Sequence, residues 1–223
     1  MENIAIIPDA RVGEGLEVIL ENYRDLNTTR CSRQGRMVIS ALKGTCLGVR
    51  DVLAQNFPGM ELSVDNVRPT GRWPAVPWIA FGGPPKYMTD RGPFLINVSY
   101  HFAADMSGVL LAILPNAEGW RERFGGNWPS KFEPFKAQFR EDLAWMKDHG
   151  FRLDDNADLS TDDPSASDMR DGYIAYKFYP ADEMPSEDEL QRDLVIACMA
   201  QQQLVNKVGG VAAIVIVLII PIQ

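Results

Sequence analysis

An alternation of apolar and polar residues in the middle of the chain constrains the fold most strongly. Apolar side chains occupy every second position from Phe94 to Phe102, and a second apolar run follows from Val109 to Leu114. A two-residue period is typical of a strand that buries one face, because successive side chains point to opposite sides. We therefore expect two neighbouring strands in a sheet.

Helical patterns surround this strand pair. Apolar residues recur at helical spacing over 12–26, and Thr45 is a candidate N-cap for a second helix. Ser130 and Ser186 are each followed three positions later by glutamate, a capping-box pattern that predicts two more helix starts. The first of these two helices is expected to end at Gly150.

The remaining segments complete the predicted order of elements. Alternation from Met60 and an apolar run over 173–179 predict two further strands. The run over 73–81 contains two prolines, which favours an edge strand or an extended segment. The acidic stretch 154–171 is expected to be a solvated loop. This order predicts a single α+β domain with a mixed, twisted β-sheet flanked by helices.

The predicted domain covers residues 14–205, with an N-terminal extension over 1–13 and an apolar tail over 206–223. The tail has no charged residue from 208 to 222 and is rich in isoleucine and valine. A membrane-spanning helix needs about 20 apolar residues, so this run is short for one. The pattern favours a buried strand or a segment that a partner covers; a membrane anchor and a sequence artefact remain alternatives.

Charge is unevenly distributed along the chain. The net charge is −8, which argues against a protein that coats nucleic acid through bulk charge. Residues 1–100 contain 11 basic and 10 acidic residues, whereas residues 101–223 contain 11 and 20. Basic residues concentrate over 24–50 and 66–100. A polyanion would therefore be contacted by the N-terminal half.

The usual signatures of catalysis and metal binding are missing from the sequence. No P-loop, Gly-x-Ser-x-Gly or acidic-x-Lys nuclease motif occurs, and His101 and His149 are expected to be structural. Three cysteines without a Cys-x-x-Cys pair argue against a zinc site and for a reducing compartment. We expect a cytoplasmic protein that is not an enzyme and uses no cofactor.

Residues 68–81 and 92–100 combine arginines with tryptophan and phenylalanine. Basic residues interleaved with aromatic ones suit a protein that holds a phosphate backbone while stacking on an exposed base. The same aromatic residues are also what an ordinary hydrophobic core contains. The pattern alone therefore leaves both interpretations open.

Longer motifs carry a family resemblance. GRWPAVPWIAF at 71–81, followed by RGPFLINVSY at 91–100, resembles the N-terminal specificity domain of McrB-type modification-dependent restriction systems. YIAYKFY at 173–179 and ELQRDL at 189–194 are similar to the close of the same domain, so the resemblance covers about residues 14–205. It implies binding of double-stranded DNA that contains a modified cytosine, by flipping that base into a pocket.

The resemblance also implies roles for individual residues. Trp78, Phe94 and Val98 match the base pocket, and Thr70 stands where a tyrosine fills the gap left in the duplex. Threonine is too small to replace a base, so a neighbour is expected to fill the gap. The other residues implied in this wedge or in contacts with the DNA backbone are Arg68, Gly71, Arg72, Trp73 and Lys86.

The predicted module lacks the nucleotide-hydrolysing motor that follows it in full-length family members. We therefore expect separate NTPase and nuclease subunits as partners. Alternative readings are an interaction protein that has lost DNA binding, a membrane-tethered form, and a metal-dependent nuclease. The preferred modification and the flanking bases are not specified by the sequence.

Overall fold

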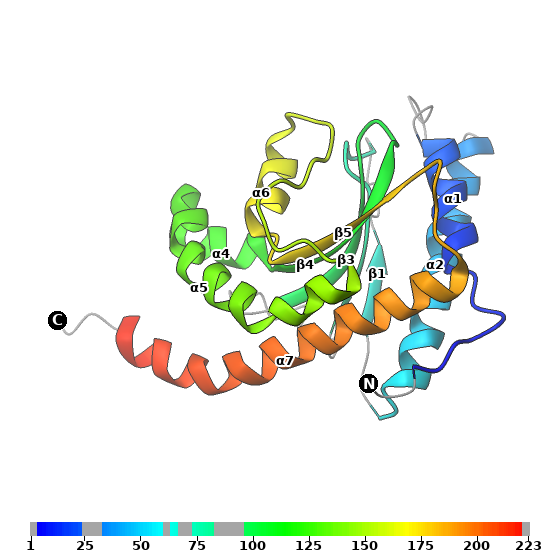
Figure 1. Ribbon diagram of the computed structural model, residues 1–223. Helices are drawn as coiled ribbons and strands as arrows, with labels where there is room; N and C mark the ends of the chain where they lie inside the picture. Colours follow the sequence, from blue (N-terminus) through cyan, green and yellow to red (C-terminus); the bar gives the residue numbers. More distant parts are fainter. Residues whose placement is uncertain (1–3, 24–32, 60–62, 67–72, 83–95, 220–223) are drawn as a thin grey trace.

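Five strands form one antiparallel sheet in the order β1-β2-β3-β4-β5 (Figure 1). A computed structural model describes residues 4–23, 33–59, 63–66, 73–82 and 96–219. The strands are β1 (Ser63–Asn66), β2 (Trp78–Gly82), β3 (Ile96–Phe102), β4 (Gly108–Pro115) and β5 (Ala175–Pro180). Helices pack beside the sheet and on its faces, which confirms the predicted single α+β domain.

Two expectations for the sheet are wrong in detail. It is antiparallel throughout rather than mixed, because the chain leaves β4 at Pro115 and enters β5 opposite Ile113, at the same end of the sheet. In addition, β2 lies between β1 and β3 rather than at an edge. Both prolines precede its first residue, Trp78, so the strand itself contains no proline that would remove a ladder hydrogen bond.

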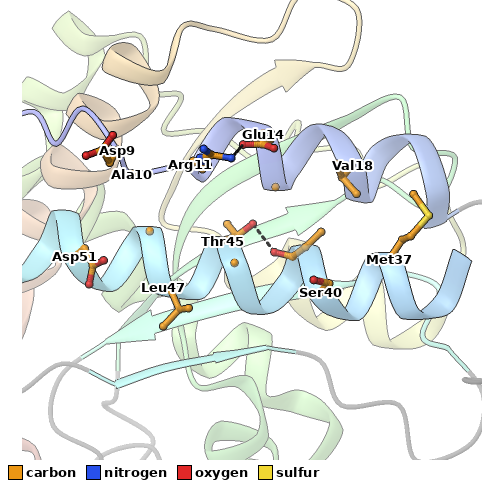
Figure 2. Close-up of a pocket in the computed structure, with 14 residues that line it drawn as sticks. Asp9, Ala10, Arg11, Glu14, Val18, Met37, Ser40, Thr45, Leu47 and Asp51 are labelled. Atoms are coloured by element: carbon orange, nitrogen blue, oxygen red, sulfur yellow. Dashed lines mark hydrogen bonds and ion pairs between the residues drawn. The ribbon is translucent and has the colours of Figure 1, made fainter. Parts of the chain in front are cut away.

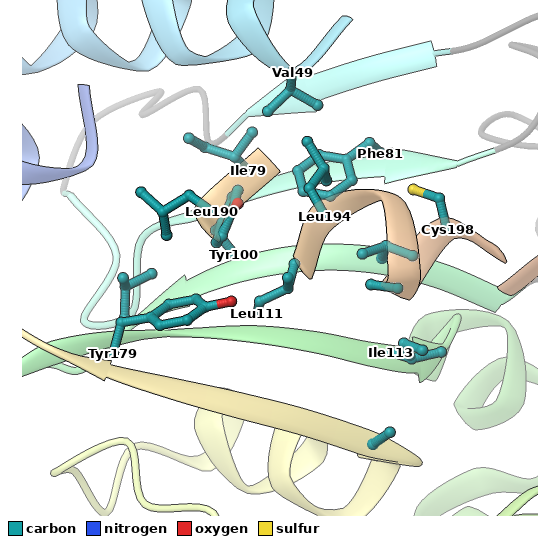
Figure 3. Close-up of a cluster of buried hydrophobic side chains, with 14 of the residues drawn as sticks. Val49, Ile79, Phe81, Tyr100, Leu111, Ile113, Tyr179, Leu190, Leu194 and Cys198 are labelled. Atoms are coloured by element: carbon teal, nitrogen blue, oxygen red, sulfur yellow. The ribbon is translucent and has the colours of Figure 1, made fainter. Parts of the chain in front are cut away.

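The helix α7 (Glu187–Ile219) covers one face of the sheet (Figure 1). Figure 3 shows Leu190, Leu194 and Cys198 of α7 above the buried side chains of the sheet. A smaller apolar cluster forms on the opposite face, where Leu110 and Ala112 of β4 are buried with residues from the region around α6. Burial of apolar area on both faces is the main favourable contribution to folding.

The helices α1 (Val12–Tyr23) and α2 (Arg33–Asn56) form a hairpin beside β1. Their backbones approach closely because Gly15 of α1 lies against the Thr45 side chain of α2. Thr45 was expected to cap the helix, and this is wrong. It is buried inside α2, where its hydroxyl donates to the Ala41 carbonyl at 2.9 Å. A threonine that bonds one turn back satisfies its polar group without ending the helix.

Between β4 and β5 the chain forms α4 (Ala117–Phe124), α5 (Trp128–Asp142) and α6 (Pro164–Gly172), with short 3-10 segments at Gly125–Asn127 and Ala144–His149. Ser130 does not cap α5, because the helix begins at Trp128 and proline occupies its first turn. Gly150 follows the second 3-10 segment with a φ of 80°, a conformation that favours glycine.

The acidic stretch 154–171 is not only a solvated loop. It contains most of α6, and two cations of α5 hold its start. Lys136 donates to Asp155 at 2.9 Å, and Arg140 donates to Asp155 at 2.8 Å and to the Tyr173 carbonyl at 2.9 Å. The Arg140 hydrogen bond, followed by that from Lys136, lowers the pKa of Asp155 to about 2. Part of the acidic charge is therefore neutralised internally.

The predicted capping box at Ser186 is confirmed. The Glu189 backbone N–H donates to the Ser186 hydroxyl, and the Glu189 carboxylate accepts from the Ser186 backbone at 3.1 Å. The N-terminal segment also joins α7, since Gln191 exchanges two hydrogen bonds with the Ile7 backbone at 2.8 and 2.9 Å.

The expectation of a buried strand in the apolar tail is wrong. Residues 208–219 continue α7, and Figure 1 shows this end, coloured red, extending beyond the rest of the molecule. Adding residues to an existing helix avoids the cost of a new nucleus, which favours continuation even through isoleucine and valine. In the part of the chain that the structure describes, no helix has the length and apolar character needed to cross a bilayer.

Two glycine-to-alanine substitutions in the α1–α2 hairpin are expected to have opposite effects. A Cβ at Gly15 would lie 2.0 Å from the Thr45 hydroxyl, so Gly15→Ala lowers the free energy of unfolding by about 1–3 kcal/mol. A Cβ at Gly44 of α2 meets nothing within 4 Å, so Gly44→Ala raises it by up to about 1 kcal/mol through helix propensity. Urea unfolding measures both; equal signs would contradict the packing described.

Candidate nucleic-acid interface

Trp78 is the first residue of β2 and is partly exposed. Its cross-strand neighbour on β3 is His101. The Phe102 N–H donates to the Pro77 carbonyl at 3.0 Å, which makes Trp78 and His101 a non-hydrogen-bonded pair. Side chains of such a pair approach most closely, so Trp78 and His101 lie together on one face of the sheet.

His101 gives Trp78 an uncharged neighbour. Its ring is 4% exposed, and its Nδ1 is hydrogen-bonded to the Tyr173 hydroxyl at 2.6 Å. Burial lowers the pKa of His101 to about 3 and raises the pKa of Tyr173 above its usual value. The imidazole and the phenol are therefore both neutral at physiological pH, and Arg140 fixes Tyr173 through its carbonyl.

The segment that leads into β2 is tied to the end of α1. Trp73 is 8% exposed, and its ring meets that of Tyr23 edge to face, with 5.4 Å between centroids. The Tyr23 hydroxyl also donates to the Pro74 carbonyl at 2.6 Å. Because Tyr23 ends α1 and Arg33 begins α2, the hairpin end of these helices lies at the same end of the molecule as Trp78.

Basic side chains form a stripe along α2. Arg36, Lys43 and Arg50 are seven residues apart, which places them on one face of the helix at intervals of about 10 Å. All three are exposed, and Arg33 adds a fourth exposed cation at the start of α2. Arg50 also pairs with Asp51 at 3.1 Å. Phosphate-binding surfaces commonly present cations along one helix face in this way.

The acidic stretch 154–171 occupies a different part of the molecule from the basic stripe. It is attached to the turn after β3, because the Ala104 N–H donates to the Leu159 carbonyl at 2.9 Å. This attaches residues near 159 to the turn between β3 and β4, on the side of α6 (Figure 1). The basic stripe of α2 lies beyond the other edge of the sheet, next to β1. The basic stripe is therefore separated from the acidic stretch 154–171, although Asp51 on α2 and Glu14 on α1 lie close to it.

The register of β2 and β3 directs Val98 and Trp78 to opposite faces of the sheet, although Trp78, at the strand end, also packs against the apolar cluster that contains Val98. Val98 pairs with Phe81 and Ile113, is 0% exposed, and belongs to the apolar cluster that includes α7. Trp78 pairs with His101, which is an odd number of positions from Val98 along β3. Side chains alternate along a strand, so the two residues point to opposite faces of the sheet.

The other residues implied in the site lie outside the described residues: Arg68, Thr70, Gly71, Arg72, Lys86 and Phe94. Of the residues that flank the segment 67–72, Trp73 leads into β2 and Asn66 ends β1. The segment that contains Lys86 and Phe94 leaves β2 at Gly82 and enters β3 at Ile96. Gly82 is four residues from Trp78, which is about 13 Å along a strand.

Sequence reasoning missed two features of this region. The bond between His101 and Tyr173 joins residues that are 72 positions apart, and no local pattern indicates it. The seven-residue spacing of the α2 cations was visible in the sequence, but only the concentration of basic residues over 24–50 was noted, not their common helix face. Among the described residues, no group of three or more His, Cys, Asp or Glu could hold a metal ion.

The buried neutral His101 predicts a pH-dependent stability. Its pKa of about 3 lies below the ordinary value of 6.5, so between these values the unfolded state binds more protons. The free energy of unfolding should therefore fall as pH decreases below 6.5, by up to about 1.4 kcal/mol per pH unit. Urea unfolding at pH 7 and pH 5 measures this decrease, before the carboxylates titrate.

His101→Gln removes the titrating group and should flatten this dependence, whereas the control His149→Gln should retain it. An unchanged pH dependence in His101→Gln would show that another group is responsible.

Comparisons with known proteins identify the family. The comparisons with curated proteins and with solved structures gave no match. A family model described as "MrcB-like, N-terminal domain" matches residues 19–206, which includes the end of α1, all of α2, the whole sheet and the covering part of α7. This match confirms the resemblance carried by the Pro77-Trp78 segment and the β5 region, and the chain belongs to the MrcB-like N-terminal domain family.

Proposed function

We propose that the protein is a non-catalytic module that binds double-stranded DNA and recognises a modified cytosine by flipping the base out of the duplex. The modification is 5-methyl or 5-hydroxymethyl. In this proposal the protein is the specificity component of a modification-dependent, type IV, restriction system in the cytoplasm. Separate subunits supply the NTPase and nuclease activities.

The observation that carries this proposal is the position of Trp78. It is a partly exposed indole at the end of β2, and that end of the molecule also holds the last residue of α1 and the start of α2, where the basic stripe begins. An indole stacks on a nucleobase with about 1–3 kcal/mol, and nearby cations hold the phosphates on either side. The family membership is consistent with DNA binding.

The backbone neighbour of Trp78 on β3 is part of a fixed, uncharged group. His101 and Tyr173 are buried, neutral and joined by a hydrogen bond, and Arg140 fixes the Tyr173 backbone. A rigid, uncharged support suits a ring that stacks on a flipped base, because the stacking partner then loses little freedom on binding. Flipping costs a few kcal/mol of unstacking, which contacts around the whole base must offset.

The three pocket residues take different roles in this proposal. Trp78 stacks on the base, and Phe94 stays a predicted pocket residue. Val98 is fully buried on the opposite face, so we assign it to the packing of β3 under α7 rather than to base contact.

The wedge is assigned to an arginine. Thr70 is too short to fill the gap in the duplex, and Trp73 is 8% exposed and packed against Tyr23. Arg68 and Arg72, which flank Thr70 and Gly71, are long enough to enter the gap, and Lys86 is left for a backbone contact.

Trp78→Ala is expected to abolish discrimination between modified and unmodified DNA. Fluorescence anisotropy compares one duplex with and without a single 5-methylcytosine, and a third with 5-hydroxymethylcytosine, at two fixed salt concentrations with EDTA present. Loss of stacking should weaken binding of the preferred modified duplex by at least tenfold, to the level of the unmodified one. The matched control is Trp145→Ala, since Trp145 is also partly buried but contacts Gln203 of α7.

Val98→Ala tests whether Val98 contributes to the base pocket or only to the hydrophobic core. It should lower the free energy of unfolding by about 2 kcal/mol and leave the preference for the modified duplex unchanged. Loss of preference in folded Val98→Ala, or full preference in Trp78→Ala, would contradict the assignment. Absence of DNA binding by the wild-type protein would favour the alternative hypothesis, an interaction protein that has lost DNA binding.

The stripe on α2 predicts a change in salt dependence. If Lys43 contacts a phosphate, Lys43→Gln should weaken the binding of modified and unmodified duplexes equally. It should also reduce the slope of the logarithm of the binding constant against the logarithm of the salt concentration by about 0.9. The control is Lys131→Gln, an exposed lysine on α5. Equal slopes for Lys43→Gln and the wild-type protein would exclude Lys43 from the interface.

A further inference from the structure

A groove of about 450 Å³ runs between α1 and α2 (Figure 2). It is separate from Trp78, which lies on the sheet. Apolar and small residues form most of its lining, and carboxylates stand at one end. Figure 2 shows Asp9 and Asp51 together at that end, and Val18 and Met37 at the other.

Gly44 in this groove is not explained by the packing of the chain itself. Gly15 is required by the Thr45 side chain, and a Cβ added at Gly48 would lie 3.3 Å from the Arg11 backbone nitrogen and from the Val12 side chain. A Cβ at Gly44, in contrast, meets no atom within 4 Å. Glycine in the middle of a helix lowers helix stability relative to alanine. Its benefit here is the open space that it leaves in the groove.

Exposed apolar side chains adjoin this space. Among the described residues, four large apolar side chains are exposed, and two of them, Met37 and Leu47, line the groove. They are 40% and 50% exposed. Large apolar groups before and after a glycine with unfilled space around it form a surface from which a bound partner can exclude water.

The charge of the lining indicates the kind of partner. The lining contains the carboxylates of Asp9, Glu14 and Asp51 and a single cation, Arg11. Arg11 pairs with Glu14 at 3.1 Å, and Arg50, from outside the lining, pairs with Asp51 at 3.1 Å. With these two pairs formed, the groove keeps one carboxylate in excess, that of Asp9, even though Lys43 of the basic stripe is next to Gly44 on α2. The groove suits a cationic group placed next to an apolar one.

We propose that this groove binds an amphipathic helix of a partner protein. The partner's apolar residues contact Met37 and Leu47, and a lysine or arginine at one end contacts Asp9 and Asp51. Met37 and Asp51 are fourteen positions apart on α2, which corresponds to about 21 Å or four helical turns. Two packed helices with small residues between them offer the groove in which a third helix packs.

The experiment uses a fluorescein-labelled synthetic peptide of fourteen residues with leucine at helical spacing and lysine at one end. A matched peptide carries glutamate in place of lysine. Fluorescence anisotropy measures the affinity of both for the full chain, for Gly44→Leu, which fills the groove, and for Gly126→Leu. Gly126 is exposed, and a Cβ there also meets nothing within 4 Å.

We expect the lysine peptide to bind the wild-type protein at least tenfold more tightly than the glutamate peptide. Gly44→Leu should weaken the binding of the lysine peptide at least tenfold, and Gly126→Leu should leave this affinity unchanged. General attraction to a protein of net charge −8 is excluded by this comparison, because neither leucine changes the charge. Asp9→Asn should weaken the lysine peptide without blocking the groove, which gives a second test.

Equal binding to Gly44→Leu and wild type, or equal binding of the two peptides, would overturn the proposal. Two other occupants are tested with the same variants. A wild-type dimer in sedimentation that becomes a monomer in Gly44→Leu would assign the groove to a second copy. A weaker DNA complex in Gly44→Leu would assign it to DNA. Either result would assign the groove to an occupant other than a partner helix and overturn the proposal.

Discussion

Burial of β4 on both faces is the constraint on which the rest of the structure depends. Every residue from Gly108 to Pro115 is buried, so the strand needs one layer above it and another below. The helix α7 supplies one layer, and the region around α6 supplies the other. Neither layer is contiguous in sequence with β4, so the fold requires the long excursion through α4, α5 and α6. Arg140 and Lys136 secure its return to the sheet.

Most elements were predictable because their patterns are local. The alternation around Val98 and the spacing in α1 both report a period that burial of one face imposes. The failed cap predictions share a cause, since each rests on a polar residue whose partner is not fixed by its neighbours. Thr45 donates to a carbonyl one turn back inside α2, whereas Ser186 caps α7, although both are hydroxyl residues that were expected to cap a helix. Parallel or antiparallel pairing of β5 depends on where a connection of many residues returns, which no local period encodes.

The site was predictable in kind but not in arrangement. The Pro77-Trp78 segment indicated an aromatic residue beside basic ones, and Trp78 is indeed partly exposed at a strand end. Which residues share its face depends on the register between β2 and β3, where Trp78 is opposite His101. A shift of one residue would have placed Val98 on that face instead. Register is set by the turns and by packing on both faces, so the neighbour His101 and its bond to Tyr173 emerge only in three dimensions.

The separation of charge has a kinetic consequence. The net charge of −8 repels a polyanion, and the α2 stripe attracts one only where that face is turned toward it. At physiological salt the Debye length is about 8 Å, so both the repulsion and the attraction act only near contact. Under the proposed function, encounters with DNA in other orientations end quickly, and the protein spends little time on DNA without the modification.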